Sequence, residues 1–240
     1  MKKIIIVISL AFWILACTTT EDEELVEFFD TSGTFTDDRD NHEYKWKKIG
    51  NQIWMTENLA YLPSVNLIKP DSTNLPHYYV YGYDGTNVNE AKATANYAVY
   101  GVLYDWKAAF DAAPAGWHLP SDAEWKQLEI DLGMTQEEVN ENIFPYYRGN
   151  DQGTQMKTKI GWHNNGNGTN SSGFSGLPGG FYFSTGDFCF IESFGFWWSS
   201  SENSKSVSWS RGLGYNKNSV SRNSTLKKNG FSIRCIKDNR

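Results

Sequence analysis

The chain has little basic charge for its size, with 22 Lys and Arg residues against 28 Asp and Glu residues in 240. Its formal net charge is −6. Proteins that bind nucleic acid use clusters of Lys and Arg to displace the counterions of the phosphate backbone. The acidic balance therefore excludes nucleic acid from the expected partners.

Sequence signatures of enzymes and metal sites are also missing. The chain has no nucleophile elbow, phosphate-binding loop or zinc signature, and no two histidines stand four residues apart. The turn with Asp37, Asp38 and Asp40 offers carboxylates of the kind that bind calcium, but it lacks the Gly and Glu of a calcium loop. We expect no cofactor, no metal and no catalytic residue, and a hydrolase or modifying enzyme is the least favoured alternative. The histidines are His42, His77, His118 and His163.

One long apolar run stands at the start of the chain, MKKIIIVISLAFWILAC, and the chain has only three cysteines. Two lysines followed by about a dozen mostly apolar residues are typical of an export signal. The run is shorter than the roughly 20 residues of a membrane-spanning helix. We therefore expect a signal peptide over residues 1–16.

The end of this run, ILAC, resembles the lipobox of bacterial lipoproteins, in which the thiol of the cysteine is lipidated, here Cys17. Leu15 is bulkier than the usual residue, and the alternative is a signal peptide with an incidental cysteine. The resemblance implies a mature protein that starts at Cys17, with the lipid bilayer as a partner. More than one acyl chain makes such an anchor stable.

An acidic segment follows, which we interpret as a tether over residues 17–33. Its run from Glu21 to Glu24 has no apolar periodicity, as expected of a solvated spacer. An acidic run just after a lipidated cysteine also resembles the surface-export signal of Bacteroidota lipoproteins. Loss of Lys2 and Lys3 with the signal peptide would take the net charge from −6 to −8. The expected location is the outer membrane, with exposure at the cell surface.

The remaining residues, 34–240, are expected to form one domain of about 200 residues, enough for a real core. Alternating segments such as YKWKKI and QIWM predict half-buried strands, and the apolar spacing in YAVYGVLYDWKAAF predicts a helix over residues 97–110. TQEEVNENI predicts a further short capped helix. We expect four tryptophans in the core: Trp106, Trp125, Trp197 and Trp198.

The segment GWHLPSDAEW places a histidine close to two carboxylates, as an acid/base site would. Ser121 followed by Glu124 also fits a capping box, and Asp122 in the first turn favours the positive end of the helix dipole. Both carboxylates therefore have structural roles at the start of a helix. Only His118 keeps an open role, for which a hydrogen-bonded structural histidine is favoured.

Six motifs follow one another along the chain: YKWKKIGNQIWMTENL, YGVLYDWKAAF, GWHLPSDAEWKQLE, GTNSSGFSGLPGG, WWSSSE and GFSIRCIKD. Together they resemble the Fibrobacter succinogenes major paralogous domain, a family of secreted and lipid-anchored bacterial proteins. The resemblance implies an α+β fold related to C-type lectin-like domains, with short twisted antiparallel strands, two main helices and long irregular loops. The segment LPSDAEW is similar to one in formylglycine-generating enzymes, which share that fold. The family has no assigned reaction.

The cysteines depart from the family pattern. Members usually carry a cysteine where this chain has Ala113, suited to pair with the one that corresponds to Cys235, and Cys189 is extra. A disulfide between Cys189 and Cys235 and two unpaired thiols are equally compatible with an oxidising compartment. Formylglycine-generating enzymes use a close pair of copper-binding cysteines, which this chain lacks.

The most favoured function is a non-catalytic binding module whose loops display aromatic side chains. Residues 66–96 and 146–173 are the candidate loops, and aromatic faces beside Asn and Asp suit carbohydrate. The expected partner is a glycan or a surface protein. The alternative is a structural or assembly component of a surface complex. The candidate binding residues are Tyr78, Tyr79, Tyr81, Tyr146, Tyr147 and Trp162.

Overall fold

A computed structural model of the chain describes residues 30–68, 75–142 and 146–238. The segment from Thr31 to Arg240 forms one compact unit. The expected signal peptide, Cys17 and most of the tether lie outside the described residues. Among those that are described, no helix combines the length and the apolar character needed to cross a bilayer.

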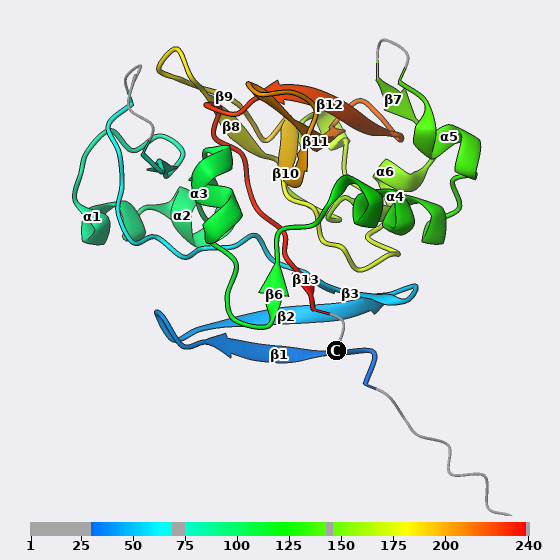
Figure 1. The fold of residues 1–240 in the computed structure, drawn as a ribbon, viewed down its shortest axis with the longest axis horizontal. Helices are drawn as coiled ribbons and strands as arrows, with labels where there is room; N and C mark the ends of the chain where they lie inside the picture. Colours follow the sequence, from blue (N-terminus) through cyan, green and yellow to red (C-terminus); the bar gives the residue numbers. More distant parts are fainter. Residues whose placement is uncertain (1–29, 69–74, 143–145, 239–240) are drawn as a thin grey trace, which may run out of the picture. The chain divides into compact units, whose positions relative to one another are not determined.

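The first sheet has five strands in the order β1-β2-β3-β13-β6 and is antiparallel throughout. Its C-terminal strand, β13, lies between β3 and β6, so the two ends of the unit meet in one sheet (Figure 1). In β2 Tyr44 is buried and Lys45 beside it is exposed, as expected of a half-buried strand, but Lys48, which strict alternation would place on the face of Tyr44, is exposed as well. The strands are β1 Ser32–Asp37, β2 His42–Ile49, β3 Gln52–Met55, β6 Trp117–His118 and β13 Ile236–Lys237.

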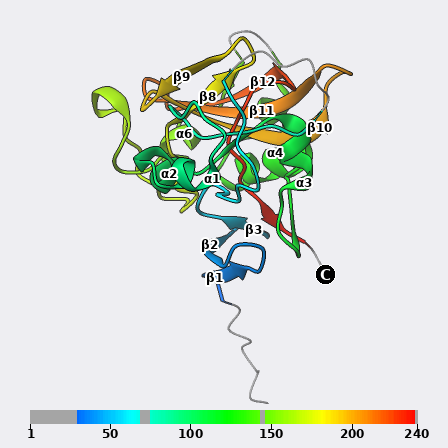
Figure 2. The ribbon, with the colours of Figure 1, turned by 90° about the vertical axis from the view of Figure 1, so that its left-hand side faces the viewer.

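The second sheet has six strands in the order β7-β12-β11-β10-β8-β9, and a short pair, β4 and β5, stands apart. All its pairings are antiparallel except that of β8 with β10. The two larger sheets lie at opposite ends of the unit, with helices between and beside them (Figures 1 and 2). The strands are β4 Tyr78–Tyr79, β5 Leu103–Tyr104, β7 Tyr147–Arg148, β8 Gly179–Phe183, β9 Asp187–Ile191, β10 Phe194–Glu202, β11 Val207–Gly214 and β12 Val220–Leu226.

The helices are short, and the helix expected over residues 97–110 is wrong. Gly101 ends α2 with a φ of 73°, the chain enters β5, and Asp105 caps a new helix, α3. Val99 and Phe110 are 52% and 55% exposed, so their spacing marks no buried face. The helices are α1 Val88–Lys92, α2 Ala95–Tyr100, α3 Trp106–Asp111, α4 Asp122–Asp131, α5 Gln136–Asn140, α6 Gln152–Met156 and the 3-10 turn η1 His163–Asn165.

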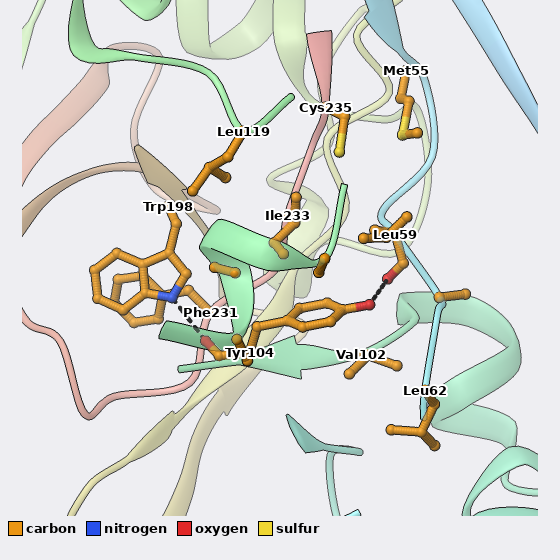
Figure 3. Packing of buried hydrophobic residues seen from close by; sticks show 14 of the residues in the cluster. Met55, Leu59, Leu62, Val102, Tyr104, Leu119, Trp198, Phe231, Ile233 and Cys235 are labelled. Atoms are coloured by element: carbon orange, nitrogen blue, oxygen red, sulfur yellow. Dashed lines mark hydrogen bonds between the residues drawn. The ribbon is translucent and has the colours of Figure 1, made fainter. Parts of the chain in front are cut away.

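The core is made of two large apolar clusters. In the first, the Tyr104 hydroxyl donates to the carbonyl of Leu59, and the Trp198 indole N–H donates to the carbonyl of Tyr104 (Figure 3). The second cluster packs Trp54, Trp125 and Trp197 around Phe174. Trp125, Trp197 and Trp198 are fully buried as expected. Trp106, in contrast, is only partly buried, and its indole N–H donates to the carbonyl of Ser199.

Both capping predictions are confirmed. Ser121 accepts from the backbone N–H of Glu124, whose carboxylate accepts from the backbone N–H of Ser121, and Thr135 and Glu138 repeat the arrangement at α5. His118 bridges two carboxylates, with Nδ1 2.6 Å from Asp238 and Nε2 2.8 Å from Glu124. Both ring nitrogens are therefore engaged, as expected of a structural histidine.

The disulfide between Cys189 and Cys235 is not formed in the structure, where both are free thiols. Cys189 lies half-buried in β9, whereas Cys235 is fully buried in the first core cluster, near Met55 (Figure 3). Burial raises the pKa of the Cys235 thiol to about 12. This thiol is therefore a packing group rather than a reactive one.

Candidate functional site

The expected aromatic binding residues do not lie together. Tyr79 and Trp162 are each 4% exposed and belong to the core, which corrects their assignment to binding loops. The Trp162 indole N–H donates to the Thr158 hydroxyl at 3.0 Å, inside its own loop. Tyr81 is half-buried against Phe188. The ring of Trp162 packs in the second core cluster together with Met156 and Phe174, its neighbours in the sequence.

Three of the expected tyrosines remain near the surface. Tyr78 lines a pocket of about 460 Å³ beside His77 and two prolines. Tyr146 lines a different pocket, and its neighbour Tyr147 faces Lys217, whose ammonium lies 5.3 Å from the ring centre. Tyr146, Tyr147 and Trp162 therefore do not line one exposed groove.

The pocket at Tyr146 combines two aromatic rings with uncharged polar groups, and we name it the Trp209 pocket. It measures about 220 Å³. Trp209 comes from β11, while its partner across the ladder, Ser224, comes from β12. The described residues that line the Trp209 pocket include no charged side chain. They are Asn142, Tyr146, Asn203, Trp209, Asn223 and Ser224.

The ring of Trp209 is held from one side by an arginine. The Arg222 guanidinium carbon lies 3.5 Å from the ring centre. Arg222 donates from Nε and Nη2 to the two carboxylate oxygens of Asp122, both at 2.8 Å. A planar guanidinium fixed in such a fork has little freedom left. The indole therefore stacks on a rigid base.

This base is part of a buried ionic network between α4 and the second sheet. Arg211 donates to Asp122 at 2.9 Å and to Glu129 at 2.6 Å, and Arg148 donates to Glu129 at 2.7 Å. Burial acts to raise the pKa of Asp122, but the hydrogen bonds and charges of Arg222 and Arg211 outweigh it and hold the pKa well below its usual range. Asp122 thus does more than favour the helix dipole: it anchors α4 to the strands that carry the pocket.

The backbone at the rim of the pocket is unusual at Tyr146, which has a φ of 65°. A bulky side chain rarely adopts this conformation, and such outliers gather at functional sites. The Tyr146 carbonyl accepts from the backbone N–H of Arg222 at 3.0 Å, so the rim is tied to the strand below it. Asn203 donates to the Ser224 hydroxyl at 2.8 Å, which fixes the opposite rim.

Two other pockets contain histidines and bear on the enzyme alternative. His77 Nδ1 lies 2.9 Å from Asp105, whose carboxylate also caps α3. His118 lines a pocket of about 340 Å³ with Phe110 and Trp117, but its two nitrogens already face carboxylates. In the described parts of the chain, no group of three or more His, Cys, Asp or Glu side chains could hold a metal ion.

Sequence reasoning missed Trp209, although a signal was present in SVSWSR. In this strand the serines at 208 and 210 are buried, while the tryptophan between them is half-exposed. The reversal has a local cause: a bulge in β10 frees backbone carbonyls, and Ser208 donates to those of Ser199 and Ser201. A strand with buried serines and a half-exposed tryptophan between them indicates that the indole ring has a role at the surface.

This chain is similar to known proteins at the level of a family. No curated protein and no solved structure gives a significant match. The sequence does match the family described as Fibrobacter succinogenes major domain over residues 48–237, which is most of the compact unit. The chain therefore belongs to the Fibrobacter succinogenes major domain family.

Proposed function

We propose that this protein is a lipid-anchored binding module of the cell envelope, with a C-type lectin-like domain that binds neutral carbohydrate in the Trp209 pocket. Sugar rings offer an apolar C–H face for stacking and hydroxyl groups for hydrogen bonds. The pocket has two aromatic rings on which a sugar ring can stack. It also has polar groups for hydrogen bonds to sugar hydroxyls, namely the amides of Asn142, Asn203 and Asn223 and the hydroxyl of Ser224.

The observation that carries this proposal is the fixed position of Trp209. Its ring is held by Arg222, which is itself held by Asp122, so the ring does not need to be ordered when a ligand binds. A rigid aromatic anchor lowers the entropic cost of binding. The pocket volume is below the roughly 300–1,000 Å³ of drug-sized pockets, which favours a single sugar residue within a longer glycan.

A glycan array tests the ligand class. The compact unit, residues 31–240, is expected to bind one group of neutral glycans, and Trp209→Ala is expected to lose that signal. Trp46→Ala is the matched control, because Trp46 is a half-buried tryptophan in β2, in the other sheet. If the array shows no binding and protein partners co-purify with the protein instead, the alternative role in envelope assembly replaces this proposal.

The anchor is tested separately by mass spectrometry of the full-length protein extracted from membranes. We expect a chain that begins at a lipidated Cys17 and a Cys17→Ser variant that is not lipidated. An unmodified cysteine at this position would refute the anchor and leave the binding proposal standing. Protease treatment of intact cells then tests the proposed exposure at the outer surface.

A further inference from the structure

A second pocket lies close to the Trp209 pocket, at the same end of β10. We name it the His118 pocket, and it measures about 340 Å³. Ser200 of β10 lines the His118 pocket, and Asn203, directly after β10, lines the Trp209 pocket. These two residues are three positions apart, a separation of about 10 Å along an extended strand. The His118 pocket is lined by Phe110, Ala113, Trp117, His118, Leu119 and Ser200.

A continuous series of side-chain contacts joins the two pockets. The centre of the Phe110 ring lies 5.4 Å from that of Trp106, and the Lys227 ammonium lies 4.2 Å from the centre of the Trp106 ring. Lys227 also forms an ion pair of 2.6 Å with Glu202, the residue directly before Asn203. Phe110 is 55% exposed and the side chain of Glu202 is 54% exposed. The series therefore runs along the surface of the protein rather than through its core.

The His118 pocket offers the same two kinds of group as the Trp209 pocket. Phe110 and Trp117 line it as aromatic residues, and Ser200 supplies a hydroxyl group. Both ring nitrogens of His118 already face carboxylates, so its imidazole forms a fixed wall of the pocket. Aromatic faces beside a hydroxyl suit the C–H face and the hydroxyls of a sugar. The two neighbouring pockets are therefore suited to the same class of ligand.

We infer that the ligand is an oligosaccharide chain that occupies the Trp209 pocket with one sugar residue and the His118 pocket with another. This inference rests on the proposed carbohydrate binding and names the ligand as a chain rather than a single terminal sugar. Between the pockets, the Glu202 carboxylate offers an acceptor and the Lys227 ammonium offers donors to the hydroxyls of the chain. The charges of this pair cancel, which is in keeping with a neutral glycan.

Two neighbouring pockets bind a linked chain more tightly than either pocket binds a single sugar. Once one sugar residue occupies the Trp209 pocket, the rest of the chain is present at the His118 pocket at a high effective concentration. The translational and rotational freedom of the chain has then already been lost. The affinity is therefore expected to rise with chain length until the chain fills both pockets, and to stay constant for longer chains.

Calorimetric titration of oligosaccharide ladders tests the inference on the compact unit, residues 31–240, which has its own core and both large sheets. The probes are β-glucan, xylan and mannan oligosaccharides from the monosaccharide to the hexasaccharide. We expect one ladder to bind, with an affinity that rises at least about tenfold from the shortest member that binds to the longest. Phe110→Ala is expected to weaken binding of the longest member at least about fivefold and to leave the shortest unchanged. Phe190→Ala is the matched control, because Phe190 is 57% exposed in β9, at the far margin of the second sheet.

The outcomes separate this inference from the proposed function. An affinity that does not depend on chain length would overturn the inference and leave carbohydrate binding in the Trp209 pocket standing. A folded Phe110→Ala variant that binds the longest member as wild type does, or that weakens the shortest and the longest equally, would have the same consequence. Absence of binding to every ladder would also overturn the inference, and a glycan array without binding would overturn the proposed function as well. Urea unfolding shows whether each variant is folded.

Discussion

Arg222 shows how single residues link the core to the surface in this protein. It stacks under Trp209 and forms a two-point hydrogen bond with Asp122, and its side chain is almost fully buried. Lysine has neither a planar face nor a fork of donors, so it can replace neither contact. The guanidinium, rather than the positive charge alone, is what positions the indole.

We therefore predict that Arg222→Lys weakens ligand binding and lowers the free energy of unfolding by about 1.5–3 kcal/mol, as expected for lost hydrogen bonds to a charged group. Urea unfolding and binding assays on the same samples measure both effects. Arg39→Lys is the control: Arg39 also stacks on a ring, Tyr61, and forms a two-point hydrogen bond with an aspartate, Asp37, away from the pocket. An Arg39→Lys variant that binds as weakly as Arg222→Lys would contradict the positioning role.

At the level of single residues, the sequence indicated Tyr146 as a candidate but not the other residues that line the Trp209 pocket. Trp209 and Asn223 come from β11 and β12, whose pairing register brings them together, and Asn203 directly follows β10, whose register against β11 shifts at a bulge. Sequence patterns do not locate such a bulge. Trp162 was misplaced for a related reason, because exposure of an aromatic in a loop depends on contacts that composition does not reveal.

Among the elements, α4 has the clearest sequence signal, and its cap supports a direct prediction. Ser121→Ala removes the side chain that accepts from the Glu124 N–H. The expected loss in the free energy of unfolding is about 1 kcal/mol, as is typical of N-caps. Ser121→Asp should restore much of it, since Asp also caps. Equal stability of wild type and Ser121→Ala in urea unfolding would show that the cap contributes nothing.

The link between β6, α4 and the end of the chain has a pH dependence whose sign follows from His118. Partial burial acts to lower the pKa of His118, but hydrogen bonds to Glu124 and Asp238 outweigh it and raise the pKa. A raised folded-state pKa gives stability that is fully present below the unfolded value, about 6.5, and is lost as the pH rises through the folded value. The imidazolium donates from both nitrogens only while it is protonated.

We predict that the stability advantage of wild type over His118→Gln shrinks as the pH rises from roughly 5 to roughly 9. The side chain is 38% exposed, so solvent screening keeps the whole effect below about 1 kcal/mol. Urea unfolding of both proteins at several pH values measures it. An advantage that grows toward alkaline pH would contradict the assigned pairing.

The helices also show where local patterns succeed and fail. The caps at Ser121 and Thr135 were predictable because a capping box is a contact between near neighbours. The helix expected over residues 97–110 failed because Gly101 and Asp105, a stop signal and a start signal, lie inside an apolar spacing that fits a helix by chance. The residues that stop and start helices therefore determined the structure of this segment, rather than its apolar periodicity.

For the whole molecule, the family and the mixture of strands and helices were predictable, because motifs in a fixed order identify a family, whereas the expected two main helices are replaced by several short ones. The central place of β13 in the first sheet was not predictable, because it pairs residues from the two ends of the unit. The same contrast between family motifs and long-range contacts applies to the cysteines. Comparison with the family marked Ala113 as the missing partner of Cys235, but only the structure shows that both pack in the first core cluster.

We predict that Ala113→Cys forms a disulfide with Cys235 under oxidising conditions. The bridge would close a loop of more than a hundred residues and is expected to raise the free energy of unfolding by about 2–4 kcal/mol, since engineered bridges return less than the loop length implies. Thermal unfolding with and without reductant measures the gain. Two free thiols in the oxidised variant, in addition to that of Cys189, would show that the expected pairing does not form.

The central claim is that the Trp209 pocket binds neutral carbohydrate, and calorimetric titration of a glycan selected on the array tests it most directly. Trp209→Ala is expected to lose at least about 2 kcal/mol of binding free energy, roughly a thirtyfold weaker affinity, as when a central aromatic contact is removed. The Trp46→Ala control should bind as wild type does. A Trp209→Ala variant that is folded and binds with unchanged affinity would contradict the claim.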